Sequence, residues 1–287
     1  MRTGEADDWL AAGSALPELV KGPIRRHNLV EWCAAENDYN TLHYEEAVAR
    51  ATGMPAVVVQ GSFQLALAGQ MLARVMACAD RLASLSITYR KAAFEGGTII
   101  AGGAVTCAAD GVVDLGLALR NGDGEVTAEG AARILRGAGA YPPAPAAGEE
   151  PPPRVDPRVA HLVTDFAATA IVPTVDLIEA GRVRDYLLAL DEDAPAGAAV
   201  PPLFLITLGR VRRPHEGRKG KGMMAGSDYW FHAPLAVGDT ISARSRIVSG
   251  EARGKDVLRA LIVSETLLTN QRGELVARRI NRVLRWE

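Results

Sequence analysis

Apolar and polar residues along the chain follow a helical pattern first and a strand-like pattern afterwards. Residues 62–80, SFQLALAGQMLARVMACAD, carry few charges and are apolar around the whole helical projection. Four segments rich in β-branched and apolar residues follow, bounded by glycine or Asx turns: residues 85–89, 98–106, 112–119 and 126–134. The pattern predicts a buried helix ahead of antiparallel strands, an α+β arrangement in which a curved sheet wraps around the helix.

The second half of the chain repeats this series. A turn signal, NQRGEL at residues 270–275, corresponds to NGDGEV at residues 121–126, and each lies between two strand-like runs. The matching helix is expected at residues 203–213, and the matching strands at residues 240–248, 257–269 and 274–286. The repetition predicts an internal duplication, so that the chain consists of two similar domains.

A proline-rich segment separates the two copies. Residues 141–158 contain seven prolines, which fix backbone angles, remove amide donors and favour an extended chain. We therefore expect one domain at residues 1–140, a linker at residues 141–158 and a second domain at residues 159–287. The length of 287 residues fits two domains of ordinary size.

Composition narrows the choice of partner. Apolar residues make up 48% of the chain and charged residues 23%, which is typical of a protein with a packed core. The net charge of -2 disfavours a dedicated binder of nucleic acid or of a membrane surface. No apolar run reaches the roughly 18 residues of a membrane span, and the start MRTGEADD lacks the basic residues of a signal peptide. We expect a cytoplasmic protein with neither kind of partner.

Two titratable residues lie just ahead of the predicted buried helix. In the sequence AENDYNTLH, Asp38 stands five positions before His43, and Asn40 or Thr41 can cap the helical segment that follows. A turn between Asp38 and His43 would let both side chains converge on one water molecule. A neutral imidazole near pH 7 can take or give a proton, and a nearby carboxylate can orient that water. The pair predicts addition or removal of water.

A third element is the sequence Gln60-Gly61-Ser62, where an apolar run ends and the predicted helix begins. Amides at the start of a helix have no intrahelical partner and carry the positive end of its dipole. The Gly61 amide could therefore hold a carbonyl oxygen that gains negative charge. Each element alone has a structural explanation, since an aspartate before a helix is often a cap and such a glycine is often a backbone requirement. Their order ahead of an apolar helix favours the chemical interpretation.

These residues resemble the MaoC-like (R)-specific enoyl-thioester hydratases and dehydratases, which have the hotdog fold. The motif of that family is similar to Gly-Asp-x-Asn-Pro-Leu/Ile-His, here Asn37 to His43 with asparagine for the glycine and Thr41 for the proline. The resemblance covers residues 29–134, and it implies that Asp38 and His43 are the catalytic pair, with Gly61 as donor to the thioester oxygen. It also implies supporting roles in substrate binding for Asn40, and for Gln60 and Ser62 beside the donor.

The second half resembles the partner module of double hotdog enzymes, and it lacks the chemical residues. Opposite Asp38, His43 and Gly61 it offers approximately Glu192, Gly197 and Pro202, and a proline has no amide hydrogen to donate. The second copy is therefore expected to be structural and to help bind substrate. Its basic stretch GRKGKGMMAG, residues 217–226, is interpreted as a loop that is either solvated and flexible or in contact with a phosphate of coenzyme A or an acidic carrier protein.

The sequence thus predicts a double hotdog hydratase or dehydratase acting on an acyl thioester of coenzyme A or of an acyl carrier protein, as a single chain or as a homodimer. Two alternatives stay open, namely another hotdog enzyme such as a thioesterase or cyclase, and a non-catalytic acyl-binding protein. No set of residues has metal-ligand spacing, so no metal is predicted. The expected chemistry needs no redox cofactor.

Overall fold

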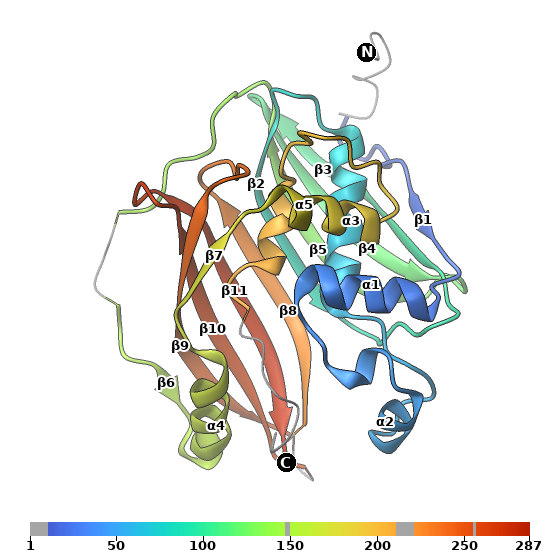
Figure 1. Cartoon of the computed structure of the whole chain (residues 1–287), viewed down its shortest axis with the longest axis vertical. Coiled ribbons are helices and arrows are strands. Elements are labelled where there is room, and N and C mark those ends of the chain that lie inside the picture. The colour runs from blue at the N-terminus through green and yellow to red at the C-terminus, as the bar shows by residue number, and fades with distance from the viewer. Residues whose placement is uncertain (1–10, 147–149, 211–220, 255–256) are drawn as a thin grey trace.

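The computed structural model describes residues 11–146, 150–210, 221–254 and 257–287. The first half contains β1 (Leu19–Lys21), α1 (Arg26–Glu36), η2 (Thr41–His43), α2 (Glu46–Ala51), α3 (Gly61–Val75), β2 (Arg81–Tyr89), β3 (Ile99–Ala109), β4 (Val112–Asn121) and β5 (Val126–Leu135). The second half contains β6 (Arg154–Val155), η3 (Pro157–Val159), α4 (Ala160–Ala170), β7 (Thr174–Leu177), α5 (Ala180–Ala189), η4 (Pro202–Thr207), β8 (Lys221–Phe231), β9 (Thr240–Arg253), β10 (Arg259–Thr269) and β11 (Leu275–Trp286). Figure 1 shows both halves on one continuous sheet.

The strand order shows the internal duplication directly. The sheet runs β1-β3-β4-β5-β2-β8-β11-β10-β9-β6, with β7 paired to β9. Reading outward from the centre, β2-β5-β4-β3 in one half matches β8-β11-β10-β9 in the other. The two copies meet where β2 and β8 pair antiparallel, with Leu85 opposite Tyr229. The predicted α+β fold, two hotdog modules in a double hotdog, is confirmed.

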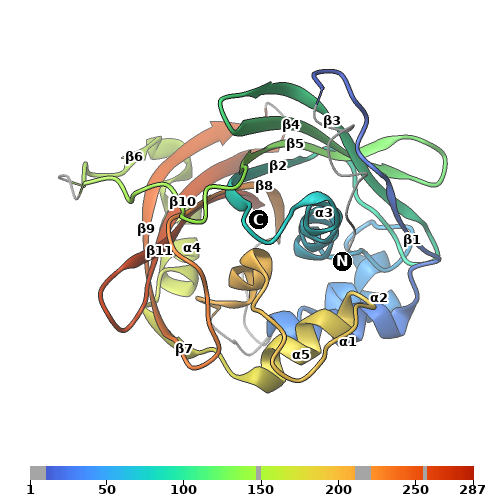
Figure 2. The ribbon, with the colours of Figure 1, turned by 90° about the horizontal axis from the view of Figure 1, so that it is seen from above.

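The inner face of the curved sheet holds the core. Viewed from above, the sheet curves around α3 and η4 (Figure 2). Helix α3 buries most of its length, as its low charge and largely apolar composition predict. Gly69 of α3 allows η4 to come close, because a Cβ at Gly69 would lie 2.2 Å from Leu203 Cδ1. The two halves therefore share one core and pack against each other through their central helices.

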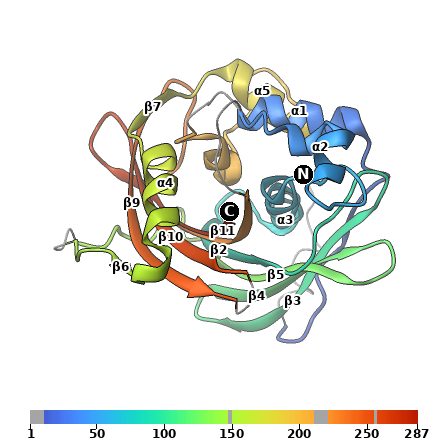
Figure 3. The same ribbon diagram turned by 90° about the horizontal axis from the view of Figure 1, so that it is seen from below.

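Helices α1 and α5 lie side by side and close the open side of the sheet (Figure 3). Four aromatic rings link them to the central helices. Trp32 lies with its ring centre 5.4 Å from that of Phe63 and 5.5 Å from that of Tyr186, and Tyr186 lies 5.6 Å from Phe204. Trp32 and Phe63 belong to the first half and the other two rings to the second. This cluster is a main contact between the halves.

Helix α4 covers the inner face of the second half beyond the end of η4. Val159, Leu162 and Val163 pack with Ala260 and Ile262 of β10 in a separate small core. The end of the proline-rich segment joins the same region, since β6 pairs in parallel with β9. Within the described ranges, no helix combines the length and the apolar character needed to cross a membrane.

The sequence interpretation was wrong at two places in the second half. Residues 221–226, interpreted as part of a basic loop, form the start of β8 and pair with β11, and Gly226 also pairs with Thr88 of β2. Pairing with β11 outweighs the glycine and lysine composition that suggested a loop. The helix expected at residues 203–213 is the short 3-10 helix η4, which ends at Thr207. Residues 211–220 lie outside the described residues.

Candidate active site

The turn that carries Asp38 and His43 has a defined local geometry. Asn37 caps the carboxyl end of α1 with a φ of 60°, in the left-handed region that favours glycine and that asparagine also tolerates. The Asn40 side chain caps η2 by accepting a hydrogen bond from the Leu42 amide at 3.3 Å. Thr41 is the first residue of η2, a position that suits proline. Both departures from the MaoC-like motif therefore fit the backbone conformation of their positions.

His43 is held in one tautomer by its contact with the chain leading into α3. Its Nδ1 lies 2.8 Å from the carbonyl oxygen of Val58. A carbonyl oxygen only accepts, so in the neutral ring Nδ1 carries the proton and Nε2 keeps a free lone pair. Burial lowers the pKa of His43, while the Val58 contact and the charge of Asp38 oppose this shift. Nε2 is therefore ready to accept a proton at neutral pH.

This arrangement predicts the acid side of the pH profile. Because the pKa of His43 is lowered, the ring stays neutral below the ordinary histidine value of about 6.5. We expect kcat/KM for an enoyl thioester to hold its plateau through about pH 6.5 and to fall only at lower pH, as the ring gains its proton. The measurement is a pH–rate profile between about pH 4 and pH 8. A midpoint above about 6.5 would contradict a neutral base with a lowered pKa.

Gly61 lies at the start of α3 and packs against a tyrosine. The Tyr89 hydroxyl donates to the Gly61 carbonyl oxygen at 2.6 Å, and a Cβ at Gly61 would lie 2.9 Å from Tyr89 Cζ. Burial raises the pKa of Tyr89 well above its ordinary value, so the phenol remains a donor. The glycine at this position thus has a packing reason, and its amide, first in the helix, has no intrahelical partner.

Adding a methyl group at Gly61 tests this packing. We expect Gly61→Ala to lower the free energy of unfolding by about 1–3 kcal/mol, because the ring of Tyr89 is rigid and overpacking is costly. Combining it with Tyr89→Leu should recover part of that loss relative to Tyr89→Leu alone. Urea unfolding of the four proteins gives both values. Strictly additive losses in the double variant would show that Tyr89 is not the obstacle.

The three residues expected to bind substrate are all engaged with the protein. The Gln60 side-chain amide donates to the Leu29 carbonyl oxygen and to Cys33 Sγ, each at 3.1 Å. The Ser62 hydroxyl donates to Glu36, and Asn40 caps η2. These contacts fix the turn and the start of α3 relative to α1. Their binding of substrate stays a prediction.

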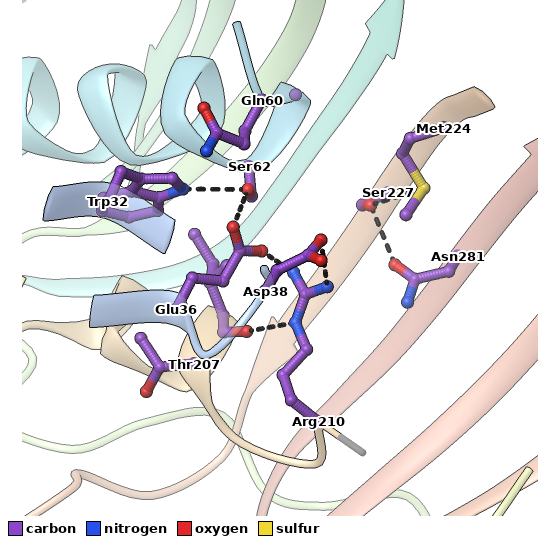
Figure 4. Close-up of polar contacts among 12 residues, drawn as sticks. Trp32, Glu36, Asp38, Gln60, Ser62, Thr207, Arg210, Met224, Ser227 and Asn281 are labelled. Carbon is purple, nitrogen blue, oxygen red and sulfur yellow. Dashed lines mark hydrogen bonds and ion pairs between the residues drawn. The ribbon is translucent and has the colours of Figure 1, made fainter. Parts of the chain in front are cut away.

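Sequence reasoning missed two charged residues beside Asp38, namely Glu36 and Arg210. Glu36 ends α1 and is 1% exposed, and Arg210 follows η4 in the other half (Figure 4). Arg210 forms an ion pair with Glu36, and its Nη1 lies 3.8 Å from Asp38 Oδ2. No local pattern marks either residue, because the pair is separated by most of the chain.

The second half also has a group of side chains that contact one another on two paired strands. Figure 4 shows Met224 and Ser227 on β8 and Asn281 on β11. The Ser227 hydroxyl donates to Asn281 Oδ1 at 2.9 Å. At the start of η4, Pro202 occupies the place that Gly61 has in α3, so no backbone N–H is present there. Among the described residues, no group of three or more His, Cys, Asp and Glu side chains could hold a metal ion.

A surface hollow of about 820 Å³ lies elsewhere, on the outer face of the sheet of the first half. Its lining includes Glu18, Arg120 and Glu129, and none of the predicted site residues. The hollow is open and faces away from α3. The candidate site is therefore assigned to the turn that carries Asp38 and His43 and to the start of α3, because the chemical groups lie there.

Comparisons with known proteins agree with this fold. Residues 167–279 match a family model described as the FAS1-like dehydratase domain region. This match falls on the half without the Asp38 motif. A search of curated protein sequences found no match to the chain.

Solved structures extend the likeness to the whole chain. A protein described as a MaoC domain dehydratase from Chloroflexus aurantiacus superposes with a TM-score of 0.70 at 12% identity, covering 100% of this chain and 98% of its own. The double hotdog protein RV0216 of Mycobacterium tuberculosis superposes with a TM-score of 0.65 at 13% identity, covering 99% of each chain. A MaoC-like dehydratase superposes with a TM-score of 0.60 at 11% identity, covering 94% of this chain and 98% of its own. The chain has the double hotdog fold of the MaoC-like dehydratases, as its sequence predicted.

Proposed function

We propose that this protein adds water to, or removes it from, the α,β bond of an acyl thioester. The fold and the dehydratase-region match support hydratase or dehydratase chemistry. The observation that carries the proposal is the fixed tautomer of His43. The ring is fixed by the contact of Nδ1 with the Val58 carbonyl oxygen, three residues before the start of α3, and this contact leaves Nε2 free. The charge of Asp38 acts on the same ring.

In the hydration direction, the Asp38 and His43 pair acts first as base and then as acid, and the Gly61 amide stabilises the developing negative charge. Water gives a proton to the Asp38 and His43 pair as its oxygen bonds to Cβ of the enoyl thioester. The electron pair of the double bond moves toward the thioester oxygen, which the Gly61 amide and the positive end of α3 stabilise. A proton from the pair then goes to Cα, and dehydration is the reverse. This balance needs no metal and no redox cofactor.

The proposal also covers the thiol that carries the acyl group and the oligomeric state of the protein. The substrate is a thioester of coenzyme A or of an acyl carrier protein, and two chains can pair as a homodimer in the cytoplasm. Nucleic acid and membranes are not partners in this proposal, in keeping with the small net charge. The second half contributes structure and one side of the substrate site.

Product analysis with a crotonyl thioester tests the proposal. We expect a 3-hydroxyacyl thioester and an approach to equilibrium from either direction. Release of free acid would instead identify a thioesterase. Binding of the thioester without either product would identify an acyl-binding protein and contradict the assignment of Asp38 and His43.

A further inference from the structure

Arg210 brings a charge from the second half into the candidate site of the first. Its guanidinium lies between the carboxylates of Glu36 and Asp38 (Figure 4). Its Nε donates to the carbonyl oxygen of Ile206 at 3.2 Å, within its own half. The planar group is therefore held on one side by η4 and on another by Glu36, and it presents Nη1 toward Asp38.

Glu36 is itself fixed by the start of α3. Its Oε2 accepts a hydrogen bond from the Ser62 hydroxyl, which in turn accepts from Trp32 Nε1 at 3.0 Å. The carboxylate is 1% exposed, and a buried charge stays close to its partner because separation would leave it unpaired. One series of contacts thus runs from Trp32 through Ser62, Glu36 and Arg210 to Asp38.

The guanidinium keeps its charge in this setting. Burial, with a smaller effect from the nearby cation of Arg279, lowers the pKa of Arg210 to about 10. Arg210 is therefore still a cation at neutral pH. Asp38 is half-buried, with 30% of its side chain exposed, and its Oδ1 accepts a hydrogen bond from the Asn40 amide at 3.2 Å. Arg210 approaches the other oxygen, Oδ2, so the two contacts together define the orientation of the carboxylate.

We propose that Arg210 is a positioning residue whose guanidinium, anchored by Glu36, orients the Asp38 carboxylate toward the reacting water. The second half then completes the active site of the first with a charged group as well as with packing. This inference rests on the proposed function, in which Asp38 is catalytic. It assigns to the half without the Asp38 motif a direct part in the chemistry.

The test removes both charges of the anchor at once. Arg210→Met alone would leave the buried charge of Glu36 without its cation and could prevent folding, so it is combined with Glu36→Gln. We expect the double variant to lose about 10–100-fold in kcat on the enoyl thioester with KM changed by less than about twofold, as for a misplaced catalytic group. Glu36→Gln alone keeps the Arg210 cation beside Asp38, so its loss of kcat should be smaller than that of the double variant.

A second comparison shows whether the effect passes through Asp38. In an Asp38→Asn background, the double variant should cause no further loss of kcat, since coupled residues are not additive. Lys21→Met is the matched control, because Lys21 also forms an ion pair across the halves, with Asp191, which is separate from the ion pairs of Arg210 with Glu36 and Asp38. It should leave kcat unchanged.

Three results would overturn the inference. The first is a wild-type kcat in the double variant. The second is a loss of kcat on adding the double variant to Asp38→Asn that equals its loss in the wild-type background. The third is a loss of kcat in Lys21→Met that equals the loss in the double variant. If the wild-type protein shows no hydration, the proposed function fails, and the crystal structure of the double variant decides the positioning claim separately. An Asp38 side chain in its original orientation there would overturn it.

Discussion

Replacing Asp38 by asparagine, or His43 by glutamine, is expected to lower kcat on an enoyl thioester by about 10²–10⁴-fold. Asparagine keeps the shape of the Asp38 side chain but cannot exchange the proton, and the amide nitrogen of glutamine is not basic, unlike the ring Nε2 that the Val58 contact leaves free. The free energy of unfolding should change little, because both side chains are half-buried. Steady-state kinetics and urea unfolding measure the two effects.

Two conservative substitutions serve as matched controls for these variants. Asp110→Asn changes an exposed aspartate in the turn between β3 and β4, at a φ of 52° that asparagine tolerates. His27→Gln changes an exposed histidine on α1. Both should keep wild-type turnover. Near-normal rates in Asp38→Asn or His43→Gln would remove that residue from the mechanism.

Replacing Trp32 by alanine is expected to lower the free energy of unfolding by about 3–5 kcal/mol. Trp32 is 0% exposed and contacts a ring from each half, Phe63 and Tyr186. Its removal leaves a cavity where the two modules meet and deprives Ser62 of the indole donor. Urea unfolding followed by circular dichroism gives the loss.

Trp230 provides the comparison for this core substitution. It is half-buried on β8 and stacks with Arg278, whose guanidinium carbon lies 4.8 Å from the ring centre. Trp230→Ala should therefore lower the free energy of unfolding clearly less than Trp32→Ala does. Equal losses would show that the aromatic cluster between the halves is not a main source of stability.

Local patterns in the sequence were sufficient to predict most of the fold. The apolar helix and the strand runs were found because burial and β-branched composition act on consecutive residues, as in α3 and β3 to β5. Strand β8 was missed because its first residues are basic and glycine-rich, and only their pairing with β11 makes them a strand. At the first residues of β8, tertiary contacts outweigh the low intrinsic strand propensity of glycine and lysine.

The candidate site was predictable only where its residues are close in the sequence. Asp38, His43 and Gly61 lie in one short stretch, and their order suggested the chemistry. Glu36 and Arg210 meet only after the two modules pair, so no spacing or motif could have joined them. The need for glycine at position 61 is explained by its close packing against Tyr89, without any catalytic role.

The most direct test of the whole account is a crystal structure of the Asp38→Asn variant with an enoyl thioester bound. We predict that the thioester oxygen lies within about 3 Å of the Gly61 amide nitrogen, with Cβ facing position 38 and His43. A thioester bound with its carbonyl turned away from the start of α3, or bound only on the outer face of the sheet, would contradict the account.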